Sequence, residues 1–181
     1  MRNFNRSYEI EENEIGFSMK TFIVDAMLGK LATWLRLTGQ DTMYSTKIHD
    51  DEFLRIAIDT GRVLLTSDEE LYHRAIDANA ETMLVRGSVD EEVASVFLKY
   101  DIEPFADASI SRCTKCNGTL EYISDEEKER IKSLVLDKTY DYYNEFWYCK
   151  YCKSVFFKGG QWLNIDEYMI RIGELMEEMK N

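Results

Sequence analysis

Three aspartate positions have the spacing of a metal site. Asp25 directly follows a β-branched apolar run, Asp50 and Asp51 open an amphipathic pattern, and Asp68 follows a second apolar run. If these runs are parallel strands, their carboxyl ends share one edge of a sheet and the carboxylates converge there. Crowded carboxylates repel one another unless a cation lies among them, and hard oxygen ligands suit Mg²⁺ or Mn²⁺. Metal-assisted hydrolysis of a phosphodiester in nucleic acid is the chemistry that this pattern favours.

A structural explanation competes with the metal site, because each aspartate precedes a helical pattern and Asp is a common N-cap. Position alone leaves the two interpretations open. Other catalytic motifs are missing. An Asp-x-Asp site would need an aspartate at Met27, and Gly29-Lys30 is followed by Leu31 instead of the Ser or Thr of a phosphate-binding loop. The two histidines, His49 and His73, are expected at the surface or at helix ends.

Four cysteines form two Cys-x-x-Cys pairs, Cys113 with Cys116 and Cys149 with Cys152. In a reducing compartment, such pairs are more often zinc ligands than disulfides, and a redox pair or an iron site is the alternative. Four thiolates complete a closed tetrahedral Zn²⁺ site, so this zinc is expected to be structural and not catalytic.

Basic and aromatic residues surround the cysteines and suggest a binding surface for single-stranded RNA, since bases stack on aromatic rings and cations follow phosphates. The alternative is that these aromatic side chains pack against the rest of the protein. The residues concerned are Arg112, Lys115, Trp147, Tyr148, Lys150, Tyr151, Lys153, Phe156, Phe157, Lys158 and Trp162.

Strands must alternate with helices if the aspartates are to converge, and the sequence has this alternation. Short apolar runs predict strands over residues 22–24, 42–44, 63–66 and 83–85, and helical stripes fill the intervals, the last over residues 90–100. Alternation with short links indicates a parallel sheet. The predicted fold class is α/β, an open parallel sheet flanked by helices, followed by a small zinc ribbon and a C-terminal helix.

This pattern divides the chain into four parts. Residues 1–18 are polar and aperiodic and are predicted to be a flexible extension, residues 19–110 the α/β domain, residues 111–165 the zinc ribbon and residues 166–181 the C-terminal helix. The apolar stripe of the last helix is expected to pack on the body of the protein. Binding of a partner protein is the alternative for that stripe.

The charge of the chain limits how it can bind nucleic acid. Its 22 Lys and Arg and 34 Asp and Glu leave a net charge of −12, which argues against strong non-specific affinity for phosphates. Residues 111–165 differ, with nine basic and eight acidic side chains. Apolar runs are too short for a membrane helix, and the first 20 residues lack a signal-peptide pattern, so the expected compartment is the cytoplasm.

Three stretches resemble a known family. They are residues 25–36 (DAMLGKLATWLR), residues 50–54 (DDEFL) and residues 61–68 (GRVLLTSD). Together they resemble the PIN-domain nucleases, and more narrowly the Mut-seven C-terminal RNase domain, in which a PIN-like domain carries a C-terminal zinc ribbon. The likeness extends over residues 20–162.

The resemblance implies that a divalent cation is held by Asp25, Asp51 and Asp68, with Asp50 as the alternative to Asp51. It further implies that Thr66 orients the turn that carries Asp68. Lys30 and Arg36 are implied as contacts to substrate phosphate.

The chain departs from the family pattern at two places. Ser67, in the substrate-facing turn, stands where the family usually has Arg or Asn, which removes a phosphate contact. A fourth acidic ligand is not evident from the sequence, and Asp90, Glu91 and Glu92 are the candidates.

The function implied is a metal-dependent endoribonuclease whose ribbon helps to place RNA. The alternative is a catalytically weak RNA-binding or ribosome-associated zinc-ribbon module.

Overall fold

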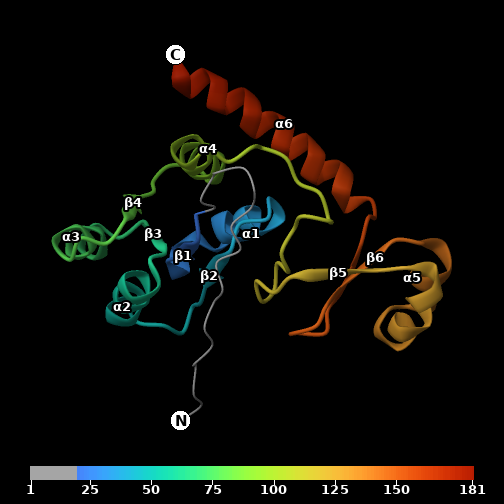
Figure 1. Ribbon diagram of the computed structural model, residues 1–181. Coiled ribbons are helices and arrows are strands. Elements are labelled where there is room, and N and C mark those ends of the chain that lie inside the picture. The colour runs from blue at the N-terminus through green and yellow to red at the C-terminus, as the bar shows by residue number, and fades with distance from the viewer. Residues whose placement is uncertain (1–19) are drawn as a thin grey trace, which may run out of the picture.

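The computed structural model describes residues 20–181. The predicted flexible extension over residues 1–18 lies outside the described residues. Two sheets are present, a parallel one near the beginning of the chain and an antiparallel one in the cysteine-rich part (Figure 1). The α/β class and the parallel sheet are thus confirmed.

The parallel sheet has four strands in the order β2-β1-β3-β4. Its two central strands, β1 and β3, are buried along their whole length, as their unbroken apolar runs predict. Val24 of β1 is in register with Tyr44 of β2 and Leu65 of β3, so three strands end at nearly the same level. The strands are β1 (Phe22–Val24), β2 (Thr42–Tyr44), β3 (Val63–Thr66) and β4 (Thr82–Leu84).

Helices cover both faces of this sheet. One face packs its apolar side chains, Phe22 and Val24 among them, against α1 and α4, and the other packs Ile23 and Leu64 against α2 and α3. These elements are the short 3₁₀ helix η1 (Ala26–Leu28) and the α-helices α1 (Gly29–Leu37), α2 (Asp50–Thr60), α3 (Glu69–Asp77) and α4 (Val89–Tyr100).

The helix boundaries follow local signals, with one correction. Gly61, with φ of 66°, ends α2 in the left-handed conformation that favours glycine. The expectation that Asp50 or Asp51 caps α2 is wrong. His49 is the N-cap residue and makes no side-chain cap bond, so both aspartates lie in the first turn, where the helix dipole favours negative charge.

The cysteine-rich part forms a three-stranded antiparallel sheet in the order β5-β6-β7. Its small core consists of Ile123, Ile131 and Phe146, with Tyr148 and Phe157 packed against it. Several ribbon aromatics therefore pack within the ribbon itself. Its elements are β5 (Leu120–Ile123), the 3₁₀ helix η2 (Asp125–Leu134), α5 (Asp137–Tyr142), β6 (Phe146–Cys149) and β7 (Val155–Phe157).

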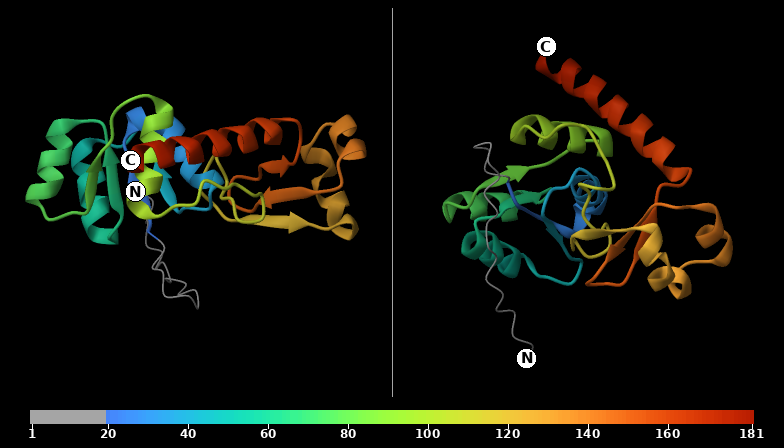
Figure 2. Two further views of the ribbon diagram at one scale, coloured as in Figure 1. Left: turned by 90° about the horizontal axis from the view of Figure 1, so that it is seen from above. Right: turned by 45° about the vertical axis from the view of Figure 1, so that its right-hand side comes forward.

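The last helix, α6 (Gln161–Lys180), begins before the predicted residue 166 and runs from the ribbon back to α4 (Figures 1 and 2). Met169, Ile172 and Met176 join the core beside α1 and α4. The ring of Tyr168 stacks on Trp34 of α1 at 3.8 Å between centroids. The apolar face of α6 thus packs on the body of the protein. Within residues 20–181, none of the helices is long and apolar enough to cross a membrane.

Replacement of Ile172 by alanine should lower the free energy of unfolding by about 2–5 kcal/mol, because a fully buried side chain would leave a cavity between α4 and α6. Urea denaturation measures this change. The matched control is Ile170→Ala on the same helix, which is 64 % exposed and should change stability by less than about 0.5 kcal/mol. Equal effects of the two substitutions would contradict the packing of α6.

Candidate functional site

Two of the predicted aspartates meet at the carboxyl edge of the parallel sheet. Asp25 follows β1 and Asp68 lies two residues after the end of β3. The hydroxyl of Thr66 joins them, since Oγ1 donates to Asp25 Oδ2 at 2.9 Å and accepts the Asp68 backbone N–H at 3.0 Å. One buried side chain therefore fixes the turns that carry both carboxylates.

Both aspartates also cap helices. Asp68 Oδ1 accepts the backbone N–H of Leu71 at 2.8 Å at the start of α3, and Asp25 Oδ1 accepts that of Met27 at 3.4 Å at the start of η1. The capping explanation is therefore confirmed for these two positions. It does not exclude a metal site, because the caps orient the same carboxylates toward the sheet edge.

Asp51 is directed elsewhere. Its carboxylate pairs with Arg74 of α3, and its side chain is 89 % exposed. Asp50 lies beside it in the exposed first turn of α2. In the part of the chain that the structure describes, no three Asp, Glu or His side chains have ligand atoms all within 4.8 Å of one another. The structure therefore links Asp25 and Asp68 through Thr66, and among the described residues none of the four aspartates belongs to a cluster of three candidate ligands.

The three candidates for a fourth acidic metal ligand lie in the first turn of α4 and have different partners. Asp90 Oδ2 accepts Arg171 Nε of α6 at 2.9 Å, and Glu91 forms a capping box with Ser88. Glu92 has neither role. Its carboxyl is half-buried, burial raises its pKa, and the charge of Lys30 in α1 opposes that rise. Spacing alone does not distinguish these residues, because all three suit a helix N-terminus.

The predicted phosphate contacts occupy different environments. Lys30 is exposed in the first turn of α1, and Ser67 is half-buried between Thr66 and Asp68. Arg36 is only 5 % exposed. Its guanidinium donates to the carbonyl oxygen of Thr42 from Nε at 3.0 Å and Nη2 at 2.9 Å, and to that of Thr114 from Nη1 at 2.9 Å. Arg36 therefore bridges β2 and the ribbon.

The four cysteine sulfurs gather at one point and could hold a zinc ion. All four Sγ atoms lie within 4.8 Å of one another, and the pairs Cys113–Cys152 and Cys116–Cys149 are each 3.4 Å apart. Tetrahedral zinc with Zn–S bonds of about 2.3 Å places sulfurs about 3.8 Å apart, so the spacing fits. Burial raises the pKa of the Cys113 and Cys116 thiols, and a bound cation would favour their thiolate forms.

A polar network that the motifs did not reveal joins this cysteine cluster to the sheet. Asn117, just after the first Cys-x-x-Cys pair, accepts the Thr42 backbone N–H at 2.9 Å and donates to Asp41 Oδ1 at 2.8 Å. Arg62 Nη1 donates to the same Asp41 oxygen at 2.7 Å, and Arg112 lies 3.6 Å from Oδ2. Burial opposes ionisation of Asp41, but these partners, Arg62 above all, hold its pKa below the usual value. No motif in the sequence marks this network. Asn117 has a left-handed φ of 67°, which asparagine tolerates well, but this conformation is known only from the structure.

We expect one zinc ion at the four cysteines. Replacement of Cys149 by serine should remove it, because three thiolates leave the tetrahedral site incomplete. The thermal midpoint should fall by at least about 5 °C, since metal binding contributes to folding. Elemental analysis and a melting curve measure the two effects. Ser154→Ala is the control, because the Ser154 side chain only accepts a weak bond from Cys152, and alanine keeps the backbone carbonyl that accepts the Cys149 N–H. Full zinc content in the Cys149 variant would contradict the assignment.

Comparisons with known proteins agree with this architecture. The family described as Mut7-C RNAse domain matches residues 20–169, from β1 to the middle of α6. Searches of curated proteins and of solved structures gave no match. The matched residues include the parallel sheet, both Cys-x-x-Cys pairs and the aspartates at the sheet edge. With most of its length covered, the chain belongs to the Mut7-C RNAse domain family.

Proposed function

We propose that the protein is a metal-dependent endoribonuclease that hydrolyses RNA phosphodiester bonds at the carboxyl edge of its parallel sheet. The observation that carries the proposal is the Thr66 hydroxyl, which fixes Asp25 and Asp68 at this edge. Membership of an RNase domain family supports a nuclease-like activity. The metal, its ligands and the reaction at this edge are our proposal.

A divalent cation fits the environment of Asp25. The residue is only 8 % exposed, and no ion pair within residues 20–181 involves it. Hydrogen bonds from Thr66 and Met27 satisfy it only in part. A buried carboxylate without a charged partner is costly, and carboxylate oxygens are the ligands that Mg²⁺ and Mn²⁺ prefer.

We assign the roles as follows. Asp25 and Asp68 hold the cation, and Thr66 holds the Asp25 carboxylate directly and the turn of Asp68 through its backbone N–H. The cation supplies Lewis-acid stabilisation of the phosphodiester and activation of water. Asp51 joins only if its carboxylate exchanges Arg74 for the cation, and Asp50 is the alternative from the same turn. Lys30 and the Ser67 hydroxyl lie where a substrate phosphate would pass.

The ribbon extends the surface available to RNA. Tyr142 and Tyr151 are exposed, and exposed rings provide stacking surfaces for the bases of a single strand. A structural zinc ion at the four cysteines would keep this surface fixed. Because the whole chain is acidic, we expect RNA to be held by these local contacts and by the divalent cation.

Replacement of Asp25 or Asp68 by asparagine should abolish cleavage of single-stranded RNA in Mn²⁺. The loss should exceed the roughly 10- to 100-fold effect of removing a group that only orients a metal ligand. Gel analysis of end-labelled RNA measures the rate. Asp59→Asn, an exposed aspartate near the end of α2, is the matched control and should cleave like the parent. Asp51→Asn should have a smaller effect, because Arg74 already holds that carboxylate.

Two outcomes would contradict the proposed nuclease activity. They are an inactive parent protein, and Asp25 and Asp68 variants that cleave as fast as the parent. RNA binding without any cleavage would instead support the alternative, a catalytically weak RNA-binding module.

Replacement of Glu92 by glutamine should lower the cleavage rate without lowering the thermal midpoint, because Glu92 is the carboxyl of the first turn of α4 that has no structural partner role. Asp90→Asn should do the reverse, since it removes the bond to Arg171 of α6. Paired rate and melting measurements separate the two roles. If both variants cleave normally, Glu92 is not part of the site.

A further inference from the structure

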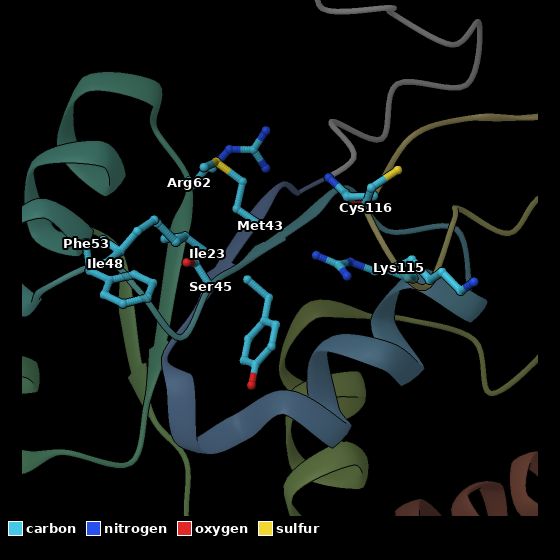
Figure 3. Close-up of a pocket in the computed structure, with 11 residues that line it drawn as sticks. Ile23, Met43, Ser45, Ile48, Phe53, Arg62, Lys115 and Cys116 are labelled. Carbon is cyan, nitrogen blue, oxygen red and sulfur yellow. The ribbon is translucent and has the colours of Figure 1, made fainter. Parts of the chain in front are cut away.

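The geometry points to a binding site for one nucleotide of a single-stranded RNA in a cavity between the end of β2 and the Cys113–Asn117 turn of the ribbon (Figure 3). The cavity has a volume of about 260 Å³. This inference rests on the proposed function, because it assigns to the cavity a part of the same substrate.

The lining of the cavity is rich in basic side chains. Eleven of the described residues line the cavity, and none of these is acidic, although the chain has 34 acidic and only 22 basic side chains. Arg36, Arg62 and Lys115 are among them. Three basic side chains in one cavity of an otherwise acidic protein favour an anion, and a phosphodiester supplies one.

Lys115 is the cation of the lining that is most available to a phosphate. The Arg36 guanidinium already donates to the carbonyl oxygens of Thr42 and Thr114, and Arg62 pairs with Asp41. Lys115 is exposed, and no ion pair among residues 20–181 involves it. Its long, flexible side chain at the rim is free to reach a phosphate at the mouth of the cavity.

The shape and polarity of the cavity suit a base. Figure 3 shows Ile48 and Phe53, the latter from α2, on one side of the cavity and Lys115 and Cys116 of the ribbon on the other. Small-molecule pockets usually measure roughly 300–1,000 Å³, so this cavity has room for one base-sized group and not for a large cofactor. Ser45 adds a polar group to the apolar wall. Apolar walls with a few hydrogen-bonding groups are typical of sites that accept an unstacked base.

The cavity lies on the strand next to the one that precedes Asp25. Tyr44 and Ser45 line it at the carboxyl end of β2, and Tyr44 is in register with Val24, the residue before Asp25. The Tyr44 hydroxyl donates to the carbonyl of Ala26 at 3.0 Å, just after Asp25. The cavity therefore begins on the strand next to Asp25, so a strand whose phosphate lies at Asp25 can place a neighbouring nucleotide there.

A peptide strand is a poorer occupant. β2 is an edge strand, but its Thr42 N–H is already bonded to Asn117 and its Thr42 carbonyl to Arg36. Pairing of an added strand with β2 is blocked at this residue. The same bonds fix the wall of the cavity that the ribbon contributes.

The experiment measures binding separately from cleavage. Fluorescence anisotropy follows a labelled single-stranded RNA of about ten nucleotides, a length within the range of single-strand sites, on full-length protein carrying Asp25→Asn. In that background, Lys115→Glu should weaken binding about tenfold and reduce its salt dependence. Lys138→Glu, an equal charge change on exposed α5, should weaken binding about twofold or less.

A second pair of variants tests the cavity by its volume and not by its charge. Ser45→Phe should weaken RNA binding about tenfold by filling the space, whereas Ser45→Ala should stay within about twofold of the parent. Zinc content and the thermal midpoint are measured on every variant. Lost affinity in a variant that keeps its zinc and its midpoint supports the site.

The outcomes separate this inference from the proposed function. If Asp25→Asn abolishes cleavage but Lys115→Glu and Ser45→Phe bind RNA like their controls, the nucleotide site is wrong and the nuclease stands. If both variants lose affinity but the parent never cleaves RNA, the nucleotide site stands and the nuclease is wrong.

Discussion

The ionised carboxylate of Asp41 is the interaction on which the arrangement of the two parts depends. It accepts hydrogen bonds from Arg62, which precedes β3, and from Asn117 in the cysteine turn. Arg112 forms a longer ion pair with it. Because the carboxylate is mostly buried, its charge is tolerable only with these partners present. The ribbon is therefore held against the sheet by directional bonds and not by a broad apolar contact. The same bonds hold Asn117 and Arg62 in the lining of the cavity beside β2.

Much of the fold is predictable from the sequence, since the spacing of apolar residues reflects local geometry. The run Val63–Thr66 has the buried pattern of a central strand, and α4 and α6 show helical stripes. The apolar spacing predicts a C-terminal helix from residue 166, whereas α6 begins at Gln161. Periodicity does not tell where a helix starts when its first turn is largely exposed.

The candidate site was predictable in part. Asp25 and Asp68 follow strands, and parallel pairing determines that strand ends meet. The partners of Asp51 and Arg36 were not predictable. Arg74 lies 23 residues from Asp51, and Thr114 lies 78 residues from Arg36, so only the folded chain brings them together. Aspartates at strand ends serve as caps and as candidate ligands at once, which is why position alone did not separate these roles.

The return of α6 to α1 and α4 changes how the chain is divided. Its apolar face completes the core that begins with Phe22, although the ribbon lies between them in the sequence. In topological terms the ribbon is an insertion into the α/β unit and not an appended domain. During synthesis, the apolar surface around Trp34 and Phe97 stays open to solvent until α6 has left the ribosome. The α/β unit can complete its core only after the cysteine-rich part has been made.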